Sequence, residues 1–148
     1  MPDAILTQAE ADVLLATQKE AEPGNRPLFP NPGTKVEVVL RSFDKRETFL
    51  LDVSRGRIKL TKMTYQHRAK QTVILARVDI DGPPHRNPDG VEVPCPHLHL
   101  YREGFADKWA EPLPATFSGG SDLWRTLEDF CRFCNIIGPT PLDRGLLL

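Results

Sequence analysis

Long apolar runs are absent from this sequence, and neither sign of charge is in excess. No apolar run approaches the ~20 residues that cross a bilayer, and the N-terminus lacks the basic-then-apolar pattern of a signal peptide. Lysine and arginine number 19 against 20 aspartate and glutamate, a net charge of −1, so a strongly basic nucleic-acid-binding domain is not indicated. We therefore expect a cytoplasmic protein with no membrane partner, in which a polyanion would meet only a local patch.

Cysteine is scarce, and its odd count argues against a disulfide framework. The three are Cys95, Cys131 and Cys134. Cys131 and Cys134 form a C-x-x-C at the C-terminal end of a predicted helix, where the helix dipole disfavours a thiolate. We expect them to be small buried packing residues rather than a redox pair.

Several motifs with known chemistry are also missing. The sequence has no glycine-rich phosphate loop, no serine nucleophile elbow and no two pairs of closely spaced cysteines. Nucleotide hydrolysis, hydrolase-type acyl transfer and a zinc ribbon are therefore disfavoured. We expect no cofactor.

What is present predicts one α+β domain over residues 1–148. Thr7 and Glu10 form a capping-box signature before a helix that reaches about Glu20. Prolines and glycines over residues 22–33 predict a surface linker, so residues 1–33 are a helix plus a Pro-rich linker. Residues 105–137 predict an irregular segment and a C-terminal helix capped by Ser121. Residues 138–148 read as a loosely held tail.

Residues 35–104 predict a bent antiparallel sheet of about five strands, with the C-terminal helix packed on it. Apolar residues alternate from Lys35 to Arg41 and again from Phe49 to Val53, and Ile58 and Leu60 continue the pattern after Gly56. The segment Val73–Ile80 is apolar on both faces, which favours a central strand. The last predicted strand follows Pro96.

This last strand presents function-capable side chains along one face. Leu98 and Leu100 point to the core, whereas His97, His99, Tyr101 and Glu103 point the other way, because strand side chains alternate. The two histidines lie about 7 Å apart by strand geometry, close enough to hold one zinc, iron or manganese ion. Glu103, His85 or His67 are candidates for a further ligand.

Acid–base chemistry is the other reading of this face. Two histidines titrate near neutrality, and Tyr101 and Glu103 can orient them or exchange protons, as metal-independent ribonucleases require. The third alternative is a set of polar side chains on the solvated face of a sheet.

A second cluster is basic and surrounds Tyr65, whose ring could stack on a base. Its members are Arg55, Arg57, Lys59, Lys62, His67, Arg68 and Lys70. Arg57, Lys59 and Thr61 share one face of the predicted third strand, a ridge about 14 Å long that suits a few phosphates. A charged edge strand that prevents aggregation is the alternative.

A proline-stiffened loop, residues 81–90, displays His85 and Arg86 with little entropy to lose on binding. We expect His85 to belong to the site, while the Asn87–Gly90 stretch is an ordinary turn signal.

Two strings carry a resemblance to a known family. They are Gly82-Pro83-Pro84-His85-Arg86-Asn87-Pro88-Asp89-Gly90 and Pro96-His97-Leu98-His99-Leu100-Tyr101-Arg102-Glu103-Gly104. The chain resembles a family of small uncharacterised bacterial proteins over about residues 49–136. Members of that family look like mobile-element or toxin–antitoxin accessory genes, and the resemblance implies no catalytic residue.

The first functional hypothesis is a cytoplasmic RNA-directed protein, a toxin-like metal-independent endoribonuclease. His97, His99, Tyr101, Glu103 and His85 would be its catalytic residues. Its RNA-binding residues would be Arg55, Arg57, Lys59, Lys62, Tyr65, Arg68 and Arg86. The alternatives are a metal-binding protein or metalloenzyme that uses His97 and His99, and a non-enzymatic inhibitor whose cognate protein partner binds the polar face.

Overall fold

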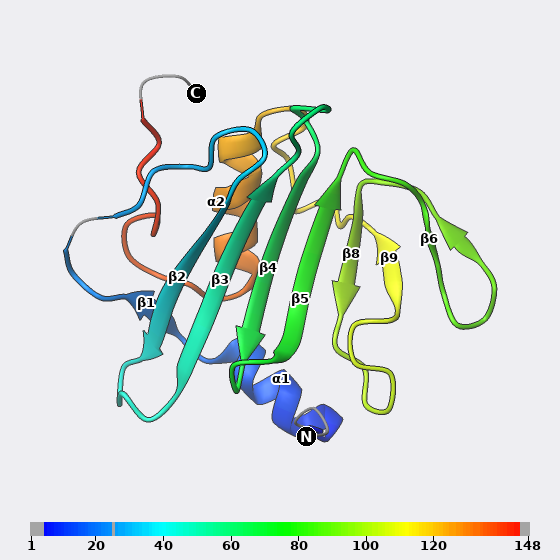
Figure 1. Cartoon of the computed structure of the whole chain (residues 1–148). Coiled ribbons are helices and arrows are strands. Elements are labelled where there is room, and N and C mark those ends of the chain that lie inside the picture. The colour runs from blue at the N-terminus through cyan, green and yellow to red at the C-terminus, as the bar shows by residue number, and fades with distance from the viewer. Residues whose placement is uncertain (1–4, 25, 146–148) are drawn as a thin grey trace.

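A seven-stranded antiparallel sheet dominates the computed structural model, which describes residues 5–24 and 26–145 (Figure 1). In sheet order the strands are β1 (Lys19–Ala21), β2 (Lys35–Ser42), β3 (Thr48–Arg55), β4 (Met63–Ala69), β5 (Val73–Ile80), β8 (His97–Leu100) and β9 (Ala110–Pro112). The short strands β6 (His85–Arg86) and β7 (Glu92–Val93) pair only with each other, and the helices are α1 (Gln8–Ala16) and α2 (Leu123–Phe133).

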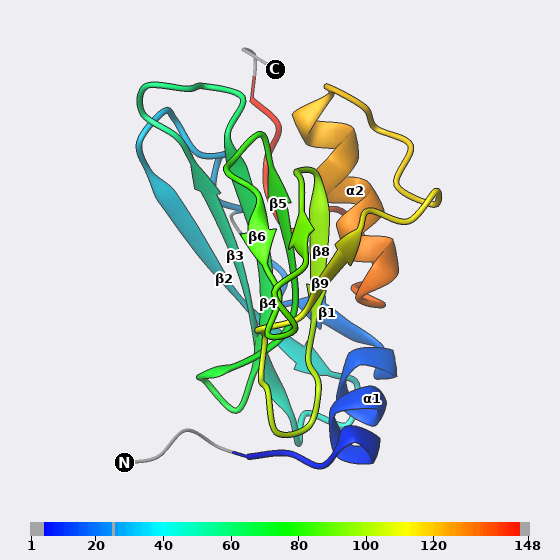
Figure 2. The ribbon, with the colours of Figure 1, turned by 90° about the vertical axis from the view of Figure 1, so that its right-hand side faces the viewer.

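The two helices lie on the same face of the sheet, and the opposite face carries no helix from the described residues (Figure 2). Leu127 and Phe130 of α2 are fully buried on the helix side, against a sheet row that includes Tyr65, Val78 and Leu98. This arrangement confirms the predicted α+β class. The sheet has seven strands rather than about five, because β1 and β9 are three residues each, too short for a period-two pattern to show. No described helix is long and apolar enough to span a membrane.

Both helix starts show how local sequence positions these elements. The Thr7 hydroxyl accepts a hydrogen bond from the Glu10 backbone N–H (3.1 Å) and the Glu10 carboxylate accepts one from the Thr7 N–H (3.0 Å), which confirms the capping box. The N-cap of α2 is Asp122 rather than the predicted Ser121.

Cys131 is buried as predicted, and this burial raises the pKa of its thiol to about 12.

The prediction of a strand through Ile58 and Leu60 is wrong. Residues 57–62 form a turn that closes on itself, with hydrogen bonds from Gly56 N–H to the Lys62 carbonyl (2.8 Å) and from Lys62 N–H to the Lys59 carbonyl (3.0 Å). Ile58 is 96% exposed at its tip. The true strand is β4, in which every second residue is buried although two of them, Tyr65 and His67, carry polar groups.

The described part of the C-terminal tail is packed, which corrects the expectation that residues 138–148 are loosely held. Leu142 is fully buried. Asp143 exchanges backbone hydrogen bonds of 2.8 Å with Pro27 and Phe29 of the Pro-rich linker. Linker and tail therefore hold each other on the surface; residues 146–148 lie outside the described residues.

Lys19 joins the C-terminal ends of the two helices inside the core. Its side chain is fully buried, and Nζ donates to the carbonyls of Leu14 (2.9 Å) and Leu15 (3.0 Å) in the last part of α1 and to that of Cys134 (2.8 Å) at the end of α2. Backbone carbonyls at a helix C-terminus carry partial negative charge, so one ammonium group stabilises both ends. Burial lowers the pKa of Lys19 to about 8.

His67 is the fourth group around this ammonium. Its Nε2 lies 3.2 Å from Lys19 Nζ, its Nδ1 lies 3.3 Å from the Leu50 carbonyl, and its ring stacks on Phe49. Because a carbonyl only accepts, Nδ1 carries the proton and Nε2 accepts from the ammonium. Burial and the neighbouring Lys19 charge lower the pKa of His67 to about 3.

This environment predicts a loss of stability on mild acidification. Below its ordinary pKa of about 6.5 the unfolded chain protonates His67 while the folded chain does not, so stability present above pH 6.5 is lost as pH falls toward 3. From pH 7 to pH 5 the free energy of unfolding should fall by about 2 kcal/mol more in the native protein than in His67→Gln. Urea unfolding with a chelator present measures how the free energy of unfolding of each protein changes with pH. An equal pH dependence in the two proteins would contradict the depressed pKa of His67.

Candidate metal centre

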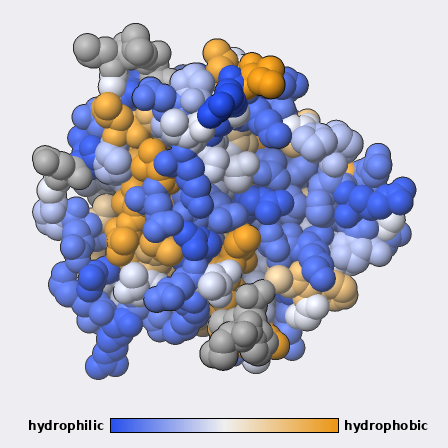
Figure 3. Space-filling model, in the orientation of Figure 1, coloured by the Kyte–Doolittle hydropathy of each residue, from blue (hydrophilic) through white to orange (hydrophobic). Residues whose placement is uncertain are grey.

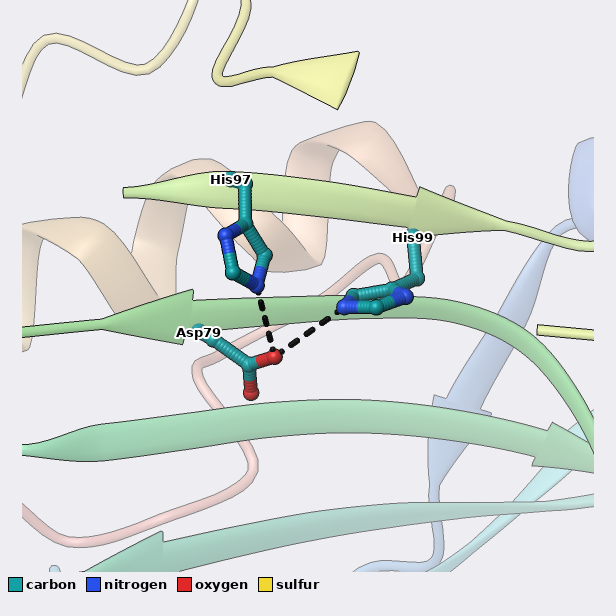
Figure 4. Close-up of side chains that lie close together, drawn as sticks. All are labelled: Asp79, His97 and His99. Atoms are coloured by element: carbon teal, nitrogen blue, oxygen red, sulfur yellow. Dashed lines mark hydrogen bonds and ion pairs between the residues drawn. The ribbon is translucent and has the colours of Figure 1, made fainter. Parts of the chain in front are cut away.

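Asp79 of β5 and His97 and His99 of β8 converge on the helix-free face of the sheet (Figure 4). Asp79 Oδ2 lies 3.0 Å from His97 Nε2 and 3.2 Å from His99 Nε2. One candidate ligand atom from each of the three residues lies within 4.8 Å of the others. Ligands bound about 2.1 Å from one ion at 90–110° to each other are separated by about 3.0–3.4 Å, so the two contacts fit a shared coordination sphere.

Both imidazole rings are held by their other nitrogen. His99 Nδ1 lies 2.8 Å from the Asp107 carbonyl and His97 Nδ1 lies 3.3 Å from the Pro94 carbonyl. Carbonyls only accept, so each Nδ1 carries a proton, and the Nε2 atom of each ring is the one that faces the Asp79 carboxylate. Two lone pairs facing a carboxylate repel it unless protons or a cation lie between them. A ring whose Nδ1–H is bound by a carbonyl is the usual outer-shell arrangement of a metal-ligating histidine.

Arg77 supplies positive charge beside two of the three ligand atoms. Its Nη2 lies 3.1 Å from His99 Nε2, its Nε lies 3.3 Å from Asp79 Oδ2, and its Nη1 donates to Asp107 at 3.0 Å. Burial alone would raise the pKa of Asp79, but the hydrogen bond with His99 and the Arg77 charge hold that pKa well below its usual range. Asp79 is therefore ionised at neutral pH, as a ligand carboxylate must be.

The hairpin β6–β7 closes over the histidines. The His85 ring lies 4.5 Å from the His99 ring and 6.0 Å from the His97 ring, measured between centroids. The Asn87 side chain accepts from the Ala110 N–H (2.8 Å) and donates to the Ala110 carbonyl (2.9 Å), which fastens the hairpin to β9. This cover explains why His97 and His99 are 2% and 0% exposed, whereas a solvated sheet face was one of the readings of the sequence.

The cluster contains the predicted His97 and His99, with His85 in contact with them, but not Tyr101 or Glu103. Tyr101 is buried, and its hydroxyl donates to the Leu6 carbonyl (2.6 Å) and accepts from the Leu6 N–H (2.9 Å). The Glu103 carboxylate accepts from the Gln8 N–H (2.7 Å) at the start of α1. The placement expected for these two side chains fails because β8 ends at Leu100 and the alternation of side chains ends with it.

The basic residues do not align into a ridge, since the strand that would order them is a turn. Arg68 binds Asp52 (2.7 Å) and Glu37 (3.0 Å), and Lys59 binds Asp81 (2.7 Å). Tyr65 is fully buried, and its hydroxyl donates to the Leu123 carbonyl.

The remaining predicted RNA-binding residues lie apart from one another. Arg55 donates to the Leu60 carbonyl, and Arg57 lies in the exposed turn. Arg86 is exposed on β6, and Lys62 lines a cleft beside the candidate centre.

Asp79 and Arg77 are the site residues that the sequence reasoning missed. A signal for them existed, because two charged residues at i and i+2 interrupt the otherwise apolar segment Val73–Ile80 on a single strand face. In register, Arg77 lies opposite His99 and Asp79 lies opposite His97. Figure 3 shows a largely hydrophilic surface on this side of the sheet.

Fold and cluster together define an α+β protein with a candidate metal-binding group on the helix-free face of its sheet. The chain belongs to a family of unknown function (DUF6978), whose sequence model matches residues 6–136. The resemblance to an uncharacterised family is confirmed at that level, whereas the link to mobile elements or toxin–antitoxin genes stays a prediction. No curated protein and no solved structure matches the chain.

Proposed function

We propose that this protein binds one divalent transition-metal ion through Asp79, His97 and His99 and uses it to activate water for hydrolysis. The observation that carries the proposal is the convergence of two imidazole Nε2 atoms on one carboxylate oxygen while both Nδ1 atoms are engaged by carbonyls. Two histidines and one carboxylate suit zinc, iron or manganese.

A catalytic ion is favoured over a structural one because the ligand set leaves room for a further ligand. Structural zinc sites are closed by four protein ligands, whereas catalytic sites keep three and an open position. A cavity of about 220 Å³ adjoins the centre and is lined by Asp79, His97 and His85. The substrate would reach the ion from this cavity, and the water bound at the open coordination position would face it.

His85 is placed to accept the proton that such a water loses. Its Nε2 lies 2.7 Å from the Lys108 carbonyl, to which it donates, so Nδ1 is the ring nitrogen that would take up a proton. A general base of this kind contributes about 10²–10⁴-fold to a rate. Arg77 would stabilise negative charge that develops on the substrate.

The metal-independent ribonuclease hypothesis loses its main supports. Tyr101 and Glu103 hold the N-terminal segment rather than the histidines, and the basic side chains do not gather into one surface. RNA cleavage that resists a chelator would revive it. A protein partner on the polar sheet face stays a prediction.

The test is metal analysis of untagged protein that has been stripped with a chelator, dialysed and then titrated calorimetrically with Zn²⁺, Mn²⁺ and Fe²⁺ in turn. We expect one equivalent of at least one ion to bind. Binding should protect the fold, raising the midpoint of thermal unfolding, because an ion that binds only the folded chain stabilises it. Folded protein that takes up none of the three ions would rule the proposal out.

A further inference from the structure

The cleft beside the candidate centre has a chemical character that narrows what it can hold. At about 220 Å³ it is smaller than the ~300–1,000 Å³ pockets of drug-sized ligands, so it suits one functional group rather than a whole large molecule. Its polar lining consists of Lys62, Thr64, Arg77, Asp79, His85 and His97. It lies where β4, β5 and β8 run side by side and the hairpin β6–β7 begins.

Positive charge prevails in this lining. Lys62 and Arg77 are cations, and Asp79 is the sole carboxylate among the lining residues. Asp79 is also the proposed metal ligand, and its Oδ1 accepts from the Thr64 hydroxyl at 3.0 Å. With a divalent ion in place, the cleft would hold more positive than negative charge, which favours an anionic ligand.

Lys62 differs from the other lysine of the same turn. Lys59 forms an ion pair with Asp81 at 2.7 Å, whereas no ion pair joins Lys62 to any acidic side chain in the described chain. Lys62 lines the cleft and Lys59 does not. An exposed lysine that has no ion-pair partner among the described residues, and that lines a cleft already containing an arginine, is available to bind a ligand's charge.

We propose that this cleft binds the phosphate group of a small phosphate ester, with Lys62 and Arg77 as its side-chain donors. The inference rests on the proposed metal-dependent hydrolysis and names its substrate class. In the reaction, the metal-bound water gives a proton to His85 as its oxygen forms a bond to phosphorus. The bond from phosphorus to the ester oxygen breaks, and the released alkoxide takes the proton from His85, so that an alcohol and inorganic phosphate leave and His85 returns to its starting state. Arginine, lysine and a metal ion are the groups that stabilise a transferring phosphoryl group.

Lys62→Ala and Lys59→Ala form the matched pair that tests this assignment, because each removes one positive charge from the same turn. Binding of inorganic phosphate is measured by ³¹P NMR with and without the bound ion, and hydrolysis is measured with p-nitrophenyl phosphate against p-nitrophenyl acetate. We expect metal-loaded native protein to bind phosphate and to prefer the phosphate ester. Lys62→Ala should weaken phosphate binding about 10-fold and leave metal affinity unchanged, and Lys59→Ala should change either by less than about 2-fold.

Equal effects of the two variants would overturn the cleft assignment, as would metal-loaded protein that binds no phosphate or prefers the acetate ester. The proposed function fails separately, through the absence of metal binding. Phosphate binding to metal-free protein that depends on Lys62 would then still support the anion site on its own.

Discussion

Replacing Asp79 with asparagine or His99 with glutamine is expected to lower the affinity for the preferred metal ion at least about 100-fold. Changing a group that only supports a metal ligand costs 10–100-fold, so loss of a ligand should cost more. Asp79→Asn is nearly isosteric and removes the charge that an ion needs. His99→Gln removes an Nε2 atom that lies 3.2 Å from the carboxylate. Calorimetric titration of stripped protein measures both losses.

His67→Gln is the matched control for the histidine variant. His67 and His99 are both fully buried, on strands of the same sheet, but His67 faces Lys19 on the helix side and lies outside the cluster. Its replacement should leave metal stoichiometry and affinity within about 3-fold at pH 7. If His67→Gln and His99→Gln weaken binding equally, the loss reflects general destabilisation and the assignment of His99 as a ligand is refuted.

The sequence predicted those elements whose signals are local. A capping box spans four residues, and the alternation in β2 and β3 follows from one buried face, so both can be read without knowledge of the rest of the chain. Strand β4 was missed because buried positions along it are occupied by Tyr65 and His67. Their burial depends on partners far along the chain, namely Leu123 and Lys19.

Only the two histidines of the candidate centre could be predicted, because only they are brought together by a local signal. His97 and His99 are two residues apart in the sequence, so one strand suffices to bring them together. Asp79 joins them only through the pairing of β5 with β8, and His85 only through the hairpin that Asn87 fastens to Ala110. No local sequence pattern predicts the register of β5 against β8 or the position of the hairpin over the histidines. Both depend on which strands become neighbours in the sheet.

Lys19→Met is expected to lower the free energy of unfolding by about 3–5 kcal/mol, the cost of removing one partner from a buried charged network. Methionine keeps most of the volume but donates no hydrogen bond. The carbonyls of Leu14, Leu15 and Cys134 would lose their shared donor inside the core, and His67 Nε2 would lose its own. A domain of ordinary stability has only about 5–15 kcal/mol to lose, so the variant should unfold in much less urea.

Lys35→Met separates this effect from the loss of a lysine charge as such. Lys35 is 54% exposed, and its ammonium lies 4.0 Å from the buried Asp52, which Arg68 already binds at 2.7 Å, so its removal should cost under about 1 kcal/mol. Urea unfolding of both variants at pH 7, with a chelator present, compares them directly. A Lys19→Met protein within about 1 kcal/mol of the native one would mean that the ammonium's contacts with the three carbonyls and with His67 Nε2 merely offset its desolvation. The junction of the two helix ends would then depend on packing, which includes the Phe49 ring 4.5 Å from the ammonium.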